Sequence, residues 1–302
     1  MADVQVRQSV RMTTPKARQG AAEQSAVPTF GVIFAATGSR YIDMAMNAVT
    51  GVRKNAAHLP VWLFTDGDVG TGHFDHVVKL TDPWRRSKID AMIASPFERT
   101  LYLDADVFVM TDVTELFSLL DRFDIALAHD QERNSAHSAA IWRRPFGACF
   151  PQFNSGVIAF RKTAAVTTLL NAWREAVRDN DMKRDQSALR ELLWHSDLRI
   201  ATLPPEYNMM DLSSVLRLDG ASIAPRIIHH YQIHRTVKGA VPGTIREMLG
   251  PAAAEAIGRM IAADRYIARA ESRQPWRLAR WRKRSLQARM AFFKLMCRLF
   301  VK

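Results

Sequence analysis

Two aspartates separated by a single alanine, Asp104 and Asp106, follow a hydrophobic segment in the middle of the chain. The segment 99–108 reads RTLYLDADVF, and apolar residues on both of its faces are typical of a strand inside a parallel sheet. Burying two ionised carboxylates is costly unless a cation or hydrogen-bond donors compensate them. Their oxygen atoms suit Mg²⁺ or Mn²⁺, ions that hold diphosphates. The short pattern alone also fits two acidic residues that open a loop.

The elements around this segment alternate between apolar runs and helical patterns. We expect strands at 30–38, 60–67, 76–80, 123–128, 153–160, 198–203 and 224–229, besides the strand that ends before Asp104. We expect helices at 41–55, 87–95, 112–120, 163–180 and 185–193. Such alternation predicts a doubly wound, mostly parallel α/β sheet. Because ligands bind beyond the carboxyl ends of the strands in these sheets, Asp104 and Asp106 lie where a site is expected.

Composition limits the class of protein. A chain of 302 residues that is 48% hydrophobic can bury a sizeable core. Its two cysteines, Cys149 and Cys297, exclude a disulfide framework and a cysteine zinc cluster, and they suit a reducing compartment. No early apolar run has the shape of a signal peptide, and no uncharged segment is long enough to cross a bilayer.

The net charge of +12 is uneven, because every charged residue after Glu271 is Lys or Arg. From Trp276 onward, a helical projection separates an apolar face that includes Trp281 and Phe293 from a basic face that includes Arg284. A basic amphipathic helix is typical of the membrane interface and is attracted to anionic lipid. The alternative is a helix that packs on the body of the protein or on a second subunit.

These patterns give a domain organisation. Residues 1–28 are polar and aperiodic, so we predict a flexible leader. Residues 29–245 form the predicted catalytic domain, and 246–302 form a helical extension with the basic amphipathic tail. The tail predicts a cytoplasmic protein that is peripheral on the inner face of the cytoplasmic membrane.

Several motifs in order resemble those of the glycogenin-like retaining glycosyltransferases, which are glycosyltransferase family eight and have the GT-A type of fold. The resemblance covers about residues 30–240. The motifs are Lys88, Asp104-Ala105-Asp106, Phe153-Asn154-Ser155-Gly156-Val157, Asp185-Gln186, Leu203-Pro204 with Tyr207-Asn208, and Ile227-Ile228-His229. The resemblance implies a GT-A type, Rossmann-like central sheet, and a metal-dependent transfer of a hexose from a nucleotide sugar with retention of configuration.

The resemblance assigns Asp104, Asp106 and His229 to a divalent cation, Mn²⁺ or Mg²⁺. The neighbouring His230 is the alternative ligand, and a core histidine is the ordinary interpretation of His229. The resemblance also implies that a cation after this histidine grips the diphosphate. Arg235 occupies that position, where a bidentate guanidinium suits phosphate, and Lys238 is a competing candidate.

Donor contacts follow from the same resemblance. Thr37 and Tyr41 correspond to the uracil-binding loop, Lys88 points to the phosphate or sugar, and Asp104 and Ala105 lie near the ribose. Lys88 is otherwise an ordinary solvated charge, and Tyr41 an ordinary core aromatic.

Three further residues correspond to the catalytic groups: Asn154 as a sugar or acceptor contact, Asp185 as a contact of the sugar hydroxyls, and Gln186 beside the anomeric carbon. Turn chemistry and helix capping are the structural alternatives for them. Asp130 is a further candidate carboxylate. Retention is explained either by front-face departure or by a covalent carboxylate intermediate.

The implied partners are a UDP-hexose donor, a glycan or glycolipid acceptor and an anionic membrane surface, with no nucleic acid. Two other classes of function compete with this one. A phosphatase of the haloacid-dehalogenase type also uses Asp-x-Asp, but it wants Thr or Val where Phe108 stands. A basic adaptor for membranes or nucleic acid would fit the charge, but it would leave the buried carboxylates without a purpose.

Overall fold

A computed structural model describes residues 29–70, 72–211, 222–231, 233 and 243–271. The predicted leader 1–28 and the predicted amphipathic tail lie outside the described residues. Within the described part of the chain, no helix is long and apolar enough to cross a membrane.

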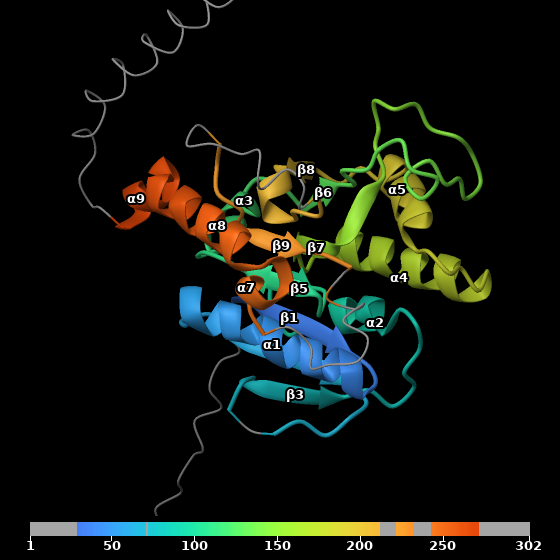
Figure 1. The fold of residues 1–302 in the computed structure, drawn as a ribbon. Helices are drawn as coiled ribbons and strands as arrows, with labels where there is room; N and C mark the ends of the chain where they lie inside the picture. Colours follow the sequence, from blue (N-terminus) through green and yellow to red (C-terminus); the bar gives the residue numbers. More distant parts are fainter. Residues whose placement is uncertain (1–28, 71, 212–221, 232, 234–242, 272–302) are drawn as a thin grey trace, which may run out of the picture.

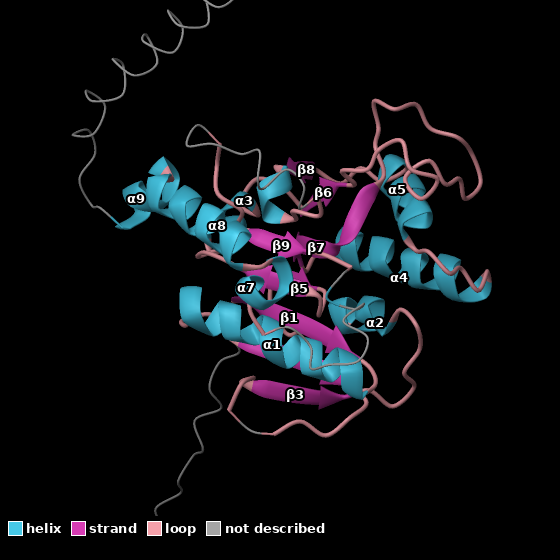
Figure 2. Ribbon diagram, in the orientation of Figure 1, coloured by secondary structure: helices cyan, strands magenta, loops and turns pink. Residues whose placement is uncertain are grey.

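A seven-stranded sheet forms the centre of the molecule, with the strand order β3-β2-β1-β4-β7-β6-β8 (Figures 1 and 2). Its strands are β1 (Phe30–Ala36), β2 (Val61–Thr65), β3 (His76–Lys79), β4 (Arg99–Leu103), β6 (Ile125–His129), β7 (Phe153–Arg161) and β8 (Ile200–Leu203). Only β7 among them runs antiparallel to its neighbours β4 and β6. The predicted α/β fold with a mostly parallel, GT-A-like sheet is therefore confirmed.

Helices cover both faces of this sheet (Figure 2). They are α1 (Ser39–Asn55), α2 (Ser87–Ile93), α3 (Glu115–Leu119), α4 (Ala164–Asp179), α5 (Gln186–Trp194), α7 (Ile245–Leu249), α8 (Pro251–Ala263) and α9 (Arg265–Glu271), with a short 3₁₀ helix at Pro205–Tyr207 (η1). One apolar cluster joins α1, α3, α7 and α8 to the sheet, and a second joins α2, α4 and α5 to the opposite face. The alternation along β4 explains the two clusters, because Leu101 and Leu103 belong to the first and Tyr102 to the second.

Two short strands leave the main sheet and pair with each other. β5 (Val107–Val109) and β9 (Ile227–His229) form an antiparallel ribbon in which Val107 lies opposite His229. The predicted strand at 224–229 is present as the shorter β9, whereas β5 was not predicted as a strand. The two strands form a separate two-stranded sheet. This ribbon brings a histidine from late in the chain beside the aspartates that follow β4.

The helices after residue 244 pack on the body of the protein. Ile245 and Ile257 belong to the same core as the central sheet. The buried Arg226 and Asp264 form an ion pair at 2.9 Å, which fastens the end of α8 to the segment before β9. The segment that carries His229 is thus held by its pairing with β5 and by the ion pair with Asp264.

Candidate active site

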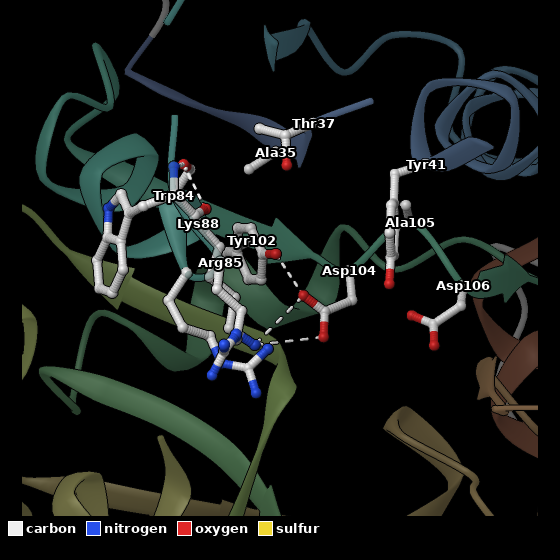
Figure 3. A pocket seen from close by; sticks show the side chains of 12 residues that line it. Ala35, Thr37, Tyr41, Trp84, Arg85, Lys88, Tyr102, Asp104, Ala105 and Asp106 are labelled. Carbon is white, nitrogen blue, oxygen red and sulfur yellow. Dashed lines mark hydrogen bonds and ion pairs between the residues drawn. The ribbon is translucent and has the colours of Figure 1, made fainter. Parts of the chain in front are cut away.

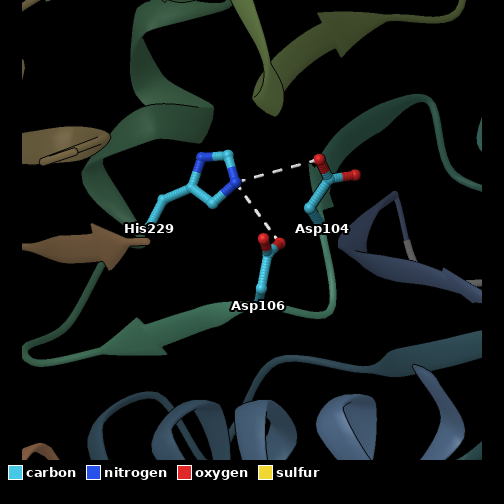
Figure 4. Close-up of side chains that lie close together, drawn as sticks. All are labelled: Asp104, Asp106 and His229. Carbon is cyan, nitrogen blue, oxygen red and sulfur yellow. Dashed lines mark ion pairs between the residues drawn. The ribbon is translucent and has the colours of Figure 1, made fainter. Parts of the chain in front are cut away.

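Two carboxylates and one imidazole converge at the end of β4 (Figure 4). The Nε2 atom of His229 lies 3.3 Å from an Asp106 oxygen and 4.0 Å from an Asp104 oxygen. One ligand atom from each of the three residues lies within 4.8 Å of the other two. Two carboxylate oxygens and an imidazole nitrogen are a donor set that suits Mn²⁺ or Mg²⁺, so these residues fit a divalent cation.

A chain of hydrogen bonds fixes the tautomer of His229. The Gly156 backbone N–H donates to Asn154 Oδ1 at 2.8 Å, and Asn208 Nδ2 donates to the same oxygen at 3.0 Å. The Oδ1 atom of Asn208 therefore faces His229 Nδ1, at 2.9 Å, and accepts a hydrogen bond from the Nδ1–H group. Because Nδ1 carries the proton, the neutral ring presents the Nε2 lone pair to the carboxylates, as a metal ligand requires.

Gly156 leaves room for the His229 ring, because it has no side chain. A Cβ atom at position 156 would lie 2.2 Å from His229 Cε1, which is closer than any real contact. This glycine sits in β7, directly beside the end of β4. The close approach of an imidazole to a strand explains why a glycine stands here.

The electrostatics of His229 reflect its two acidic neighbours. Burial acts to lower the pKa of His229, but Asp106, and then Asp104, raise it above its usual value. His230 differs, because burial and the charge of His229 lower its pKa. The His230 ring packs against Tyr231, while Nε2 of His229 faces Asp106. This geometry favours His229 over His230 as the metal ligand.

A second cluster of charges adjoins the first. Lys88 Nζ lies 3.3 Å from Asp104 and 3.7 Å from the buried Asp185, and it donates to Ser155 Oγ at 2.9 Å. Arg86 Nε completes the cluster at 3.1 Å from Asp185. Burial alone would raise the pKa of Asp185, yet Lys88 and Arg86 lower it, so this carboxylate is ionised at neutral pH.

A cavity of about 270 Å³ opens beside these charges (Figure 3). Its lining includes the predicted donor contacts Thr37, Tyr41, Lys88, Asp104 and Ala105. We call it the donor cavity. Its remaining lining residues are Ala35, Trp84, Arg85, Arg86, Ser87, Tyr102 and Asp106. Cationic and aromatic side chains at one wall and carboxylates at the other are the chemistry that a nucleotide with a metal-bound diphosphate needs.

Three other predicted residues, Asp185, Gln186 and Arg235, differ in how far the structure explains them. Asp185 stands at the N-terminus of α5 but makes no capping hydrogen bond, so capping does not explain it. Gln186 is buried beside Gln152, whose Nε2 lies 3.4 Å from Gln186 Oε1. Arg235 lies outside the described residues, as does its competitor Lys238.

Sequence reasoning missed several residues of the site. Arg86 precedes Lys88 by two positions in a basic stretch, which was the available signal. The Tyr102 hydroxyl donates a hydrogen bond to Asp104. In the sequence, Tyr102 only alternates with Leu101 along a strand, a pattern that indicates a buried face and no role in a site. Asn208 belonged to a quoted motif but had no role, although its side chain orients His229. Asn154 Oδ1 is engaged in that same network.

The part of the chain that carries these residues also matches a protein family. A family model described as nucleotide-diphospho-sugar transferase matches residues 39–229, more than half of the chain. No curated protein matches the chain.

Among solved structures, the glycosyltransferase GlyE of Streptococcus pneumoniae TIGR4 is similar, with a TM-score of 0.51 and 18% identity over 77% of this chain and 63% of GlyE. The chain thus spans less than two thirds of GlyE. A galactosyltransferase, LgtC, solved with donor and acceptor sugar analogs, has a TM-score of 0.47 and 13% identity over 76% of this chain and 95% of LgtC.

Proposed function

Because the chain belongs to the nucleotide-diphospho-sugar transferase family, we propose that it is a metal-dependent, retaining glycosyltransferase that moves a hexose from a UDP sugar to a glycan or lipid-linked acceptor. The observation that carries the proposal is the convergence of Asp104, Asp106 and His229 beside the donor cavity. A phosphatase or a non-catalytic adaptor would not need this combination. We accordingly assign no second function.

Asp104, Asp106 and His229 would hold the cation, Mn²⁺ or Mg²⁺. When bound, such an ion neutralises a diphosphate and polarises it as a Lewis acid. Lys88 and Arg86 supply fixed positive charge next to this place, and their charge stabilises the diphosphate as it leaves the sugar. Arg235 is proposed as a further diphosphate contact, on the strength of its position in the sequence.

The proposed reaction exchanges one bond for another at the anomeric carbon. The bond from this carbon to the diphosphate oxygen breaks, and its electron pair leaves with the phosphate. The acceptor hydroxyl oxygen forms the new bond, and its proton passes to the departing phosphate. Gln186 is proposed to face the anomeric carbon, and Asn154 to contact a sugar through its amide nitrogen.

Front-face departure fits the state of Asp185 better than a covalent intermediate does. Its Oδ1 atom faces Arg86 at 3.1 Å, and its Oδ2 atom accepts from Ser155 Oγ at 3.0 Å. A carboxylate held at both oxygens is a weak nucleophile but a good acceptor for sugar hydroxyls. Mass spectrometry of the enzyme after rapid mixing with donor tests this choice, and a glycosylated Asp185 peptide would establish the covalent scheme.

The basic tail underlies the proposal of a lipid-linked or envelope glycan acceptor at the inner membrane face. We expect the full chain to float with vesicles that contain anionic lipid. A chain that ends at Gln274 should remain in the dense fraction. Equal flotation of both proteins would remove the tail from the proposal.

A donor-hydrolysis screen tests the proposed activity. The protein is incubated with a panel of nucleotide hexoses and Mn²⁺, and released nucleoside diphosphate is measured. We expect release from a UDP-hexose that requires the metal. An Asp68→Asn variant, altered at a fully exposed carboxylate, serves as the matched control. Absence of release from every nucleotide sugar would contradict the proposed function.

A further inference from the structure

A second cavity, of about 400 Å³, lies between the long loop 130–152 and α5. We call it the loop pocket. Its polar lining includes Asp130, Arg133, Gln152 and Arg190, and its apolar lining includes Phe146 and Phe150. Figure 1 shows this loop extending from the ends of β6 and β7 beside α5. The donor cavity does not share these lining residues.

Arg190 has an unusual environment for an arginine. It is buried, with 6% of its surface exposed, and burial lowers its pKa although the charge of the adjacent Glu191 acts in the opposite direction. Its Nη2 donates to the Ala140 carbonyl at 3.0 Å, but its Nε has no hydrogen-bond partner among the described residues. A buried charge normally has a partner, because burying it unpaired is costly. The loop pocket therefore presents a guanidinium that is ready for an anion.

Gln152 gives an independent sign of a ligand. Only 2% of this residue is exposed, and its Oε1 atom has no hydrogen-bond donor among the described residues. Buried polar atoms are almost always satisfied, so an unpaired acceptor in a cavity wall suits a donor on a ligand, such as a hydroxyl group. The pocket thus offers a cation for an anionic group and an amide oxygen for a hydroxyl.

Aromatic side chains form the third component. The Phe146 and Phe150 rings lie 6.1 Å apart, and the Arg190 guanidinium lies 5.1 Å from the Phe146 ring centre. The C–H face of a pyranose ring packs well on such aromatic surfaces. Flat apolar surfaces with a few convergent polar groups are the usual make-up of a small-molecule site.

The position of the loop pocket links it to the site. Gln152 lines the pocket and contacts Gln186 at 3.4 Å. Asp185, the residue before Gln186, contacts Lys88 and Arg86 of the donor cavity. The two cavities therefore flank the Asp185–Gln186 pair, where the proposed function places the sugar that is transferred.

We propose that the loop pocket binds the acceptor, and that this acceptor is a saccharide carrying a phosphate or carboxylate group, which Arg190 holds. This inference rests on the proposed function and adds the chemical class of the acceptor. Arg133, at the exposed rim of the same pocket, adds positive charge for the same group. Bidentate pairing with arginine suits both phosphate and carboxylate.

Calorimetry with simple sugars tests the proposal. The protein is saturated with UDP and Mn²⁺ to fill the donor cavity, and then titrated with glucose 6-phosphate, glucuronic acid or glucose. We expect the two anionic sugars to bind about tenfold more tightly than glucose, because hydrogen bonds to a charged group are stronger. The comparison of the two anions shows whether phosphate or carboxylate is preferred. Equal binding of glucose would overturn the proposal.

Variants assign the preference to the pocket. Arg190→Gln should abolish it, whereas Arg143→Gln should retain it, because Arg143 lies on the same loop but stacks on Trp142. If the buried Arg190 variant does not fold, Gly147→Asp provides the same test. A Cβ atom there meets only Cys149 Sγ at 3.5 Å, so a carboxylate can be added to the pocket wall without strain. Retained preference in folded Arg190→Gln or Gly147→Asp would contradict the assignment.

Two measurements separate this inference from the proposed function. UDP binding with Mn²⁺ and donor hydrolysis report on the donor cavity, and the preference for anionic sugars reports on the loop pocket. Absence of UDP binding and of donor hydrolysis in the wild-type protein would contradict both proposals. Normal UDP binding and hydrolysis without a preference for anionic sugars would contradict the loop-pocket proposal alone.

Discussion

The donor cavity and the loop pocket adjoin the same residue pair but are built differently. The donor cavity is formed by the ends of strands and a short helix, and several of its charged groups form ion pairs, as Lys88 does with Asp104. The loop pocket is formed mainly by one long loop, and two buried polar atoms in its wall, Gln152 Oε1 and Arg190 Nε, have no hydrogen-bond partner among the described residues. The donor cavity therefore contains a preorganised network of charges, and the loop pocket contains polar atoms that a ligand could pair with.

This difference suggests a division of labour between rigid and variable parts. Groups that hold a diphosphate must keep their geometry, and strand ends supply such rigidity. Most of the groups proposed to bind the acceptor sit on a loop, with Arg190 on α5 as the exception. Substitutions in a loop change specificity without disturbing the sheet. The following predictions test whether the two regions respond separately.

The largest expected effect comes from removing a metal ligand. Asp106→Ala should lower donor hydrolysis about a thousandfold, because the charge stabilisation at such a centre is worth several kcal/mol. Release of nucleoside diphosphate measures it, with Asp68→Asn as the exposed control. The anion preference of the loop pocket should persist. Near-normal hydrolysis by a folded Asp106→Ala protein would contradict the assignment of Asp106 to the metal.

The next effect concerns stability and touches neither cavity. Burial acts to raise the pKa of Asp264, but Arg226 and the Ala224 N–H lower it below its usual value. Its stabilising effect is therefore present above the unfolded pKa of about 3.9 and is lost as pH falls through the lower folded pKa.

Asp264→Asn should reduce the free energy of unfolding by about 3 kcal/mol at pH 7, because it leaves the buried Arg226 without its partner. Urea unfolding at pH 7, 5 and 3 measures this, and the difference from wild type should shrink below about pH 4. A difference that is constant over this range would show that the ion pair is not its source.

A smaller effect is expected from the residue that orients His229. Asn208→Ala should weaken Mn²⁺ binding about 10–100-fold, because partners of this kind hold a ligating histidine in its tautomer. Titration of the protein with Mn²⁺ measures the affinity. Asn171→Ala, which removes an amide that bonds only the Thr167 carbonyl in α4, is the control. Unchanged Mn²⁺ affinity in Asn208→Ala would separate the histidine from the metal.

The smallest effect is expected from one added methyl group. Gly156→Ala should cost about 1–3 kcal/mol, because its Cβ would overlap the His229 ring. Gly147→Ala, in the loop pocket, should change the free energy of unfolding little, since nothing closer than Cys149 Sγ meets its Cβ. Thermal unfolding compares the two variants. Equal stability would show that the ring does not pack on Gly156.

The sequence predicted the parts of the fold that depend on local patterns. Apolar residues on both faces identified β4 as a central strand, apolar runs located β1 and β7, and helical periodicity located α1 and α4. The direction of β7 was beyond reach, because an apolar run reads the same in a parallel or an antiparallel strand. The pairing of β5 with β9 depends on contacts between distant segments, which local propensity does not encode.

The site divides in the same way. Asp104, Asp106, Lys88 and His229 were identified because their motifs occur in a familiar order, and the structure brings them together. Arg86 stands two positions before Lys88 and Asn208 belongs to one of the motifs, but their roles were not predicted because their partners are distant in the sequence. The loop pocket was also missed, since it arises from the way a long polar loop folds against α5.

Crystals grown with UDP and Mn²⁺ would test the central claim most directly. The anomalous scattering of manganese locates the ion independently of any assumption about its ligands. The account predicts one peak coordinated by Asp104, Asp106 and His229 Nε2, in contact with the diphosphate. A diphosphate bound in the donor cavity with no manganese at these three side chains would contradict it.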